Sequence, residues 1–83
     1  MTAYQKAAAE AEVKGVAATK ASLQMPSGEC RTWEEHKAVS QAHEAAATSH
    51  RQAANIATPL NRITHQQKAE IYDARARAEM RSV

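Results

Sequence analysis

Alanine dominates this sequence, and large apolar side chains are scarce. Twenty of the 83 residues are Ala, whereas Val, Leu and Ile together number nine and Phe is absent. Ala is the strongest helix former, and no segment shows the apolar and polar alternation of a strand. The net charge of +2 is too low for a typical disordered chain. The composition therefore predicts an all-α fold whose helices pack through small side chains.

Two capping boxes mark where the first two helices begin. In each, a Thr side chain and a side chain three residues later satisfy backbone N–H groups at the helix start. The first pairs Thr2 with Gln5, and the second pairs Thr32 with Glu35. Pro and Gly within residues 25–28 predict a turn that ends the first helix.

A third helix is expected after Thr58, because Pro59 suits the first position of a helix. Thr64 is an alternative cap for a later start. The single expected domain, residues 1–83, is thus a three-helix bundle or an elongated hairpin with a third helix. The expected helices cover residues 2–23, 32–57 and 59–81.

The first and third helices each carry two apolar stripes, although a helix in a simple monomeric bundle needs only one. One side of the first helix carries Ala9, Val13, Val16 and Leu23, and the other carries Tyr4, Ala8, Ala11, Gly15 and Ala18. In the third helix the stripes are Leu60, Ile63, Ile71, Ala74 and Ala78, and Ala69, Tyr72, Ala76, Met80 and Val83. Small alanines on an ordinary surface would explain the second stripe, and so would a second packing partner.

Under the packing-partner interpretation, the stripe through Tyr72 is the outer one and binds another protein. Trp33, the only tryptophan, either closes one end of the core or serves as an exposed anchor. The predicted partner-binding residues are Trp33, Tyr72, Arg75, Ala76, Arg77 and Met80.

A seam of small residues along the second helix predicts self-association. These positions follow a heptad spacing, and small side chains let helices approach closely. Because so few bulky side chains are present, a lone monomer would have a thin core, and a homodimer is expected to supply additional burial. The seam consists of Val39, Ala42, Ala46, Ala53 and Ile56.

His36, His43 and His50 lie seven residues apart and therefore share one edge of the second helix. Seven residues of rise is about 10.5 Å, too far for two imidazoles to reach one metal ion. No metal site and no cofactor are predicted. The edge is either a pH-responsive packing edge or a row of ordinary flanking polar residues.

Catalysis is not expected, so no catalytic residue is assigned. The carboxylates, Glu79 among them, fall where solvated helix surfaces would have them, and the single Cys30 has no neighbour that would activate it. Two glycines cannot build a phosphate-binding loop. With no signal peptide and no apolar run long enough to span a bilayer, the chain is expected to be cytoplasmic, without a membrane partner.

Nucleic-acid binding is the main alternative. The third helix carries several basic residues, and the short connection near residues 57–61 is compatible with a helix-turn-helix. Acidic residues interrupt that basic stretch, however, and the net charge is small, so attraction to phosphate would be weak. The basic residues are Arg62, Lys68, Arg75, Arg77 and Arg81.

The sequence thus favours a small protein-binding regulator, adaptor or inhibitor that occludes a surface of another protein. Short helical chains of this kind are common among phage and bacterial accessory proteins, including inhibitors of host systems. A structural subunit of a larger assembly is a further alternative.

Overall fold

The computed structural model describes residues 1–24 and 31–81, which form an all-α three-helix bundle without strands in those two segments. The helices are α1 (Ala3–Gln24), α2 (Trp33–Asn55) and α3 (Pro59–Arg81). Their ends lie within two residues of the ranges expected from the sequence. The expected turn at 25–28, Cys30 and Val83 lie outside the described residues.

Both capping boxes are formed. The backbone N–H of Gln5 donates to the Thr2 hydroxyl, and that of Thr2 donates to the Gln5 side chain. Thr32 and Glu35 make the same reciprocal pair, with distances of 3.2 and 2.9 Å. These bonds satisfy N–H groups that a helix start otherwise leaves without acceptors, so the first turns of α1 and α2 are fixed by local chemistry.

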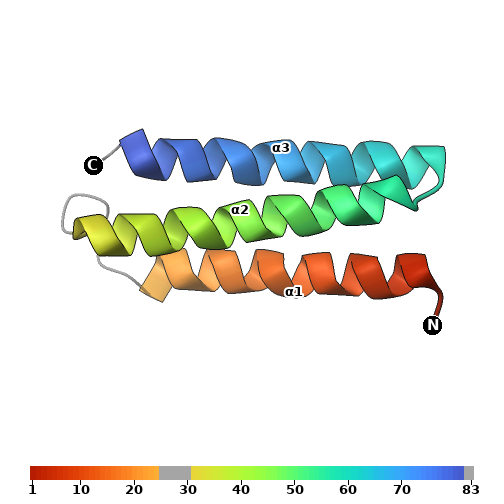
Figure 1. Ribbon diagram of the computed structural model, residues 1–83, viewed down its shortest axis with the longest axis horizontal. Helices are drawn as coiled ribbons and strands as arrows, with labels where there is room; N and C mark the ends of the chain where they lie inside the picture. Colours follow the sequence, from red (N-terminus) through yellow and green to blue (C-terminus); the bar gives the residue numbers. More distant parts are fainter. Residues whose placement is uncertain (25–30, 82–83) are drawn as a thin grey trace.

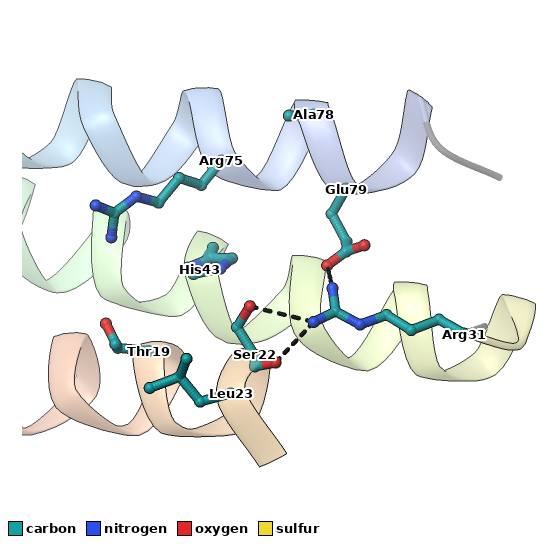
Figure 2. A pocket seen from close by; sticks show the side chains of 8 residues that line it. All are labelled: Thr19, Ser22, Leu23, Arg31, His43, Arg75, Ala78 and Glu79. Carbon is teal, nitrogen blue, oxygen red and sulfur yellow. Dashed lines mark hydrogen bonds and ion pairs between the residues drawn. The ribbon is translucent and has the colours of Figure 1, made fainter. Parts of the chain in front are cut away.

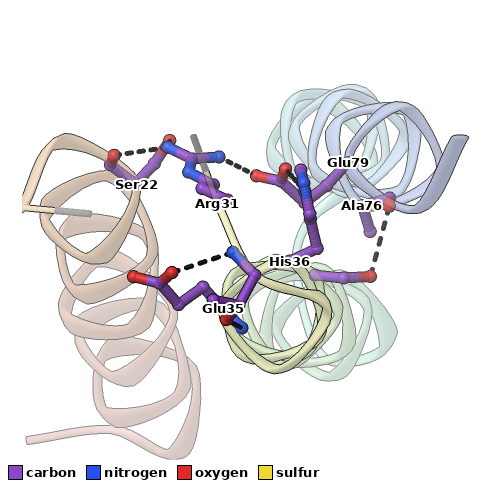
Figure 3. Close-up of polar contacts among 8 residues, drawn as sticks. Ser22, Arg31, Glu35, His36, Ala76 and Glu79 are labelled. Atoms are coloured by element: carbon purple, nitrogen blue, oxygen red, sulfur yellow. Dashed lines mark hydrogen bonds and ion pairs between the residues drawn. The ribbon is translucent and has the colours of Figure 1, made fainter. Parts of the chain in front are cut away.

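The α2 helix lies between α1 and α3, and neighbouring helices run antiparallel (Figure 1). The main packing contacts are those of α2 with α3 and of α1 with α2. The backbone is elongated and flat, with extents of 42 × 21 × 14 Å. Viewed along the helices, α1 and α3 flank α2 and leave between them a space that side chains cross (Figure 3).

The buried hydrophobic residues are almost all alanines, which allows α2 to approach both of its neighbours closely. Within the two described segments, Val39 is the only fully buried aliphatic side chain larger than Ala. The buried hydrophobic residues are Ala11, Ala18, Val39, Ala46, Ala47, Ala53, Ala54, Ala57, Ala69 and Ala76.

The sequence-based assignment of Tyr72 and Ala76 to an outer face of α3 was wrong, although Met80 of the same stripe is exposed. Ala76 is 3% exposed and Tyr72 is only partly exposed, whereas Leu60 and Ile71 are half or more exposed. The Ala and Gly side of α1 likewise faces inward, and its Val and Leu side faces solvent. Close approach to α2 selects the small stripe of each helix, because bulky side chains at those positions would hold the helices apart.

Candidate functional site

The three histidines of α2 do share one side of the helix, and that side faces the interior. His36, His43 and His50 are each at most 5% exposed, and His65 of α3 joins them at 6%. Among the described residues, His50 and Val39 are the largest fully buried side chains. The interpretation of this row as ordinary flanking residues was therefore wrong, because the imidazoles supply much of the interior volume that bulky aliphatic residues supply elsewhere.

A chain of hydrogen bonds joins all three helices near the N-terminus of α1. The Tyr4 hydroxyl lies 2.9 Å from Nε2 of His65, and Nδ1 of His65 lies 3.0 Å from Nδ1 of His50. The Tyr4 and His65 rings meet edge to face, with centroids 5.7 Å apart. A tyrosine from α1 and two histidines from α3 and α2 thus form one continuous polar contact.

Tyr72 of α3 lies between two of the histidine rings of α2. Its ring stacks on His43 and His50, with centroids 5.9 and 5.7 Å away. Arg75 sits over the same ring, 5.4 Å from its centroid. The hydroxyl end of Tyr72 points at the backbone of Gly15 on α1, so this one side chain connects all three helices.

A second polar cluster lies at the other end of the bundle, around Glu79. Arg31 reaches between α1 and α3, donating to the Glu79 carboxylate on one side and to the Ser22 carbonyl oxygen on the other (Figures 2 and 3). Nδ1 of His36 also contacts the Glu79 carboxylate. Glu79 was expected at the solvated surface, but it is buried because it pairs with these two groups.

Burial controls the protonation of three of the four interior histidines. It is the largest effect that lowers the pKa of His43, His50 and His65. The cationic Lys68 lowers the pKa of His50 and His65 further, and Glu12 raises both. The side chains of Lys68 and Glu12 are themselves 3.0 Å apart, so one ion pair faces the His50–His65 contact. The neutral imidazole is favoured at all three sites.

A furrow runs along the bundle between α1 and α3. Three cavities of about 450, 330 and 170 Å³ line up there and share lining residues, with His43, His50 and Tyr72 at the base. Apolar side chains of both outer helices flank it, together with Lys20 and Arg75 (Figure 2 shows one end). We call this surface the α1–α3 furrow and define it by Val16, Thr19, Lys20, Leu23, Ile71, Arg75 and Ala78.

The predicted partner-binding residues do not form one surface. Ala76, Arg77 and Met80 line a separate hollow of about 300 Å³ between α2 and α3, together with Ser40, Glu44 and Arg81. Tyr72 and Arg75 face α1 instead. Trp33 is about half exposed, with the Lys37 ammonium over its ring, so it does not close the core. The exposure of Ile71 was not predicted, because the Tyr72 stripe was taken as the outer one of α3. The exposure of Val16 and Leu23 was not predicted either, because neither stripe of α1 was assigned to the core or to solvent.

The predicted self-association seam is occupied within the chain. Val39, Ala46 and Ala53 are fully buried, Ala42 is partly buried, and Ile56 is half exposed. Small residues on α2 do mediate close helix packing, as expected, but their partners are α1 and α3 of the same chain. The homodimer itself stays a prediction, for which the exposed aliphatic residues are the better surface.

The basic residues of α3 point to different neighbours and form no single cationic face. Arg62 donates to the carbonyl oxygens of Ala54 and Ala57 at the end of α2. Lys68 pairs with Glu12, whereas Arg77 lies in the α2–α3 hollow. Helices α2 and α3 also run side by side rather than crossing steeply (Figure 1), so they do not have helix-turn-helix geometry.

Within residues 1–24 and 31–81, no group of three or more His, Cys, Asp or Glu side chains is arranged to hold a metal ion. Across the same segments, no helix combines the length and apolar character needed to span a bilayer. Comparison with protein-family models, with curated proteins and with solved structures finds no match.

Proposed function

We propose that this chain is a small, non-enzymatic protein-binding module that acts as a regulator, adaptor or inhibitor by covering a surface of its partner. One observation carries the proposal. Of the eight Val, Leu and Ile residues in the described segments, seven are at least half exposed. Soluble proteins usually bury these residue types, and clustered exposed aliphatic residues mark interaction sites.

The α1–α3 furrow supports this proposal best, because it combines apolar area with a defined charge. Val16 and Leu23 stand on its α1 side and Ile71 on its α3 side. Lys20 and Arg75 add positive charge at its edges. A partner that presents an apolar ridge bordered by carboxylates, such as an amphipathic helix, would complement both features.

The buried polar groups support a structural role rather than catalysis. The imidazoles of His36, His50 and His65 and the Glu79 carboxylate bond to one another or to groups on neighbouring helices. These bonds stabilise an interior that has few bulky side chains. A catalytic acid or base, by contrast, must be able to contact a substrate.

The experiment compares baits that differ only on this surface. The chain is immobilised and exposed to an extract of the cells that encode it, beside Val16→Lys/Ile71→Lys and a control, Ala45→Lys/Gln52→Lys. The control adds the same charge to exposed positions of α2. A protein retained by wild type and control but lost from the furrow variant supports the proposal. Equal retention by all three baits excludes the α1–α3 furrow as the binding surface, and retention by none overturns the proposal.

A further variant separates the two hollows. Met80→Glu places a charge in the α2–α3 hollow and leaves the α1–α3 furrow unchanged. If the retained protein is lost with Met80→Glu but kept with Val16→Lys/Ile71→Lys, the partner binds the hollow that contains the sequence-predicted residues. The partner then has to be purified and its binding to each variant measured directly.

A further inference from the structure

The contact between His50 and His65 restricts how many protons the interior can hold. With Nδ1 of one ring 3.0 Å from Nδ1 of the other, one nitrogen must carry a hydrogen and the other must accept it. Two neutral rings satisfy this requirement in either direction. The Tyr4 hydroxyl beside Nε2 of His65 is both a donor and an acceptor, so it adapts to each arrangement.

One added proton also fits this geometry. If His50 becomes an imidazolium, its Nδ1–H donates to Nδ1 of His65, and the Nε2–H of His65 donates to Tyr4. If His65 is the charged ring, it donates to both neighbours. A second proton does not fit, because two N–H groups and two positive charges would then face each other across 3.0 Å. The pair therefore accepts one proton in the closed bundle and rejects the second.

The surroundings give a second charge little stabilisation. His50 and His65 are 1% and 6% exposed. The groups that face them are Glu12 and Tyr4 from α1, and Lys68, Tyr72 and Arg75 from α3. Glu12 is the only anion among these groups, and it already pairs with Lys68. A doubly charged pair must therefore gain water, which requires the helices to separate.

Near the histidine pair, α1 is the helix that is held least firmly in the bundle. Its buried residues are Ala11, Gly15 and Ala18, which contribute little apolar area. It packs on α2 through these small residues, and side-chain contacts also join it to α3. Two of those contacts, Tyr4 with His65 and Glu12 with Lys68, surround the histidine pair. We propose that the His50–His65 pair is an acid-operated latch, in which the second proton separates the two rings and releases α1 from α2 and α3.

The latch is tested by titrating the histidine ring signals by NMR from pH 8 to pH 4.5 while amide hydrogen exchange is followed in α1. We expect His50 and His65 to take up a first proton with α1 still protected, and a second as the protection of α1 is lost. Independent titration of the two rings with α1 protected throughout overturns the proposal. The proposal is also overturned if the hydrogen-exchange protection of α1 is lost in step with the titration of His43 alone, since His43 is also buried.

Two substitutions in the Glu12–Lys68 ion pair distinguish an electrostatic effect on the histidine pair from a general loss of stability. Lys68→Gln and Glu12→Gln break the same contact, so a purely structural effect would move the pH midpoint of α1 release in the same direction for both. The latch predicts opposite shifts. Removing the Lys68 cation lets the closed pair hold protons more easily and lowers the midpoint, whereas removing the Glu12 anion raises it.

Arg51→Gln is the matched control, because it breaks the exposed Arg51–Asp73 pair between α2 and α3. Its midpoint should equal that of wild type. Shifts of the same sign in the first two variants, or no shift in either, overturn the latch. These results do not depend on the partner, so the latch and the proposed function fail independently.

Discussion

The hydroxyl oxygen of Tyr72 lies so close to Gly15 that a Cβ atom added at position 15 would be only 2.5 Å from it. The glycine therefore makes room for the tyrosine to reach from α3 across α2 to the backbone of α1. The Tyr72 ring cannot easily move aside, because His43 and His50 stack against it. A glycine inside a helix, ordinarily unfavourable, is explained here by one close approach.

Gly15→Ala should destabilise the protein by about 1 to 2 kcal/mol. An added methyl group overpacks the contact, which costs about 1–3 kcal/mol, and the better helix propensity of Ala offsets up to about 1 kcal/mol of that. Chemical denaturation followed by circular dichroism measures the change.

The matched background is Tyr72→Phe, which removes the hydroxyl and leaves the ring Cζ, 3.1 Å from the added Cβ, as the nearest atom. In that background Gly15→Ala should be close to neutral. If the loss is the same with Tyr and with Phe at position 72, the close approach does not explain the glycine.

Glu79→Gln should lower the free energy of unfolding by about 3 kcal/mol, because breaking a buried ion pair leaves its partners uncompensated. Arg31 and His36 both contact this carboxylate. Glu70→Gln, an exposed position on the same helix, should change stability by less than about 0.5 kcal/mol. Equal effects of the two substitutions would show that the Glu79 cluster contributes nothing to stability.

The helix starts could be predicted because they depend on local chemistry. Thr2 with Gln5 and Thr32 with Glu35 satisfy backbone groups within one turn, so their roles can be inferred from neighbouring residues. The shared side of His36, His43 and His50 could also be predicted, because helix geometry alone places residues seven apart together.

The inward face of each outer helix could not be predicted by assuming that bulky residues lie inside. In this bundle the histidines and Tyr72 fill the interior, and small residues bring the helices close enough to contact them. Position 57, seven residues after His50, is a buried Ala. A small residue at the next position of the histidine row was the feature of the sequence that indicated that this edge faces inward.

Ala46→Leu should destabilise the chain by about 1 to 3 kcal/mol, because the seam on α2 is already filled by the chain's own helices. Ala45→Leu is the control, since the neighbouring side chain is exposed. Thermal unfolding and light-scattering mass distinguish the two roles proposed for the seam. A change of oligomeric mass with Ala46→Leu, without loss of stability, would favour the self-association seam predicted from the sequence.

Thr32→Ala should cost about 1 kcal/mol, the usual effect of losing an N-cap side chain. The hydroxyl accepts the Glu35 N–H, and the Glu35 side chain accepts the Thr32 N–H in return. Glu35→Ala should therefore lose part of the same energy, and the double substitution should lose less than the sum of the two. Additive losses in denaturation experiments would mean that the two bonds act separately.

Stability should fall as the pH is lowered from 7.5 toward 5, and the sign follows from the three buried imidazoles. Burial lowers the pKa of His43, His50 and His65 in the folded chain, so below about pH 6.5 the unfolded chain binds protons that the folded chain does not. Each site that stays neutral in the folded chain contributes up to about 1.4 kcal/mol per pH unit. The contribution is complete above the unfolded pKa and is lost as the pH falls toward the folded values.

Urea denaturation at pH 7.5, 6.5 and 5.5 measures this slope. His43→Gln should make the slope shallower by up to about 1.4 kcal/mol per pH unit, because one proton-rejecting site is gone while the His50–His65 pair stays in place. Lys37→Gln, at an exposed position of the same helix, should leave the slope unchanged. A stability that is flat or rises on acidification would mean that the imidazoles are charged inside the bundle, and the neutral interior inferred from their burial would be wrong.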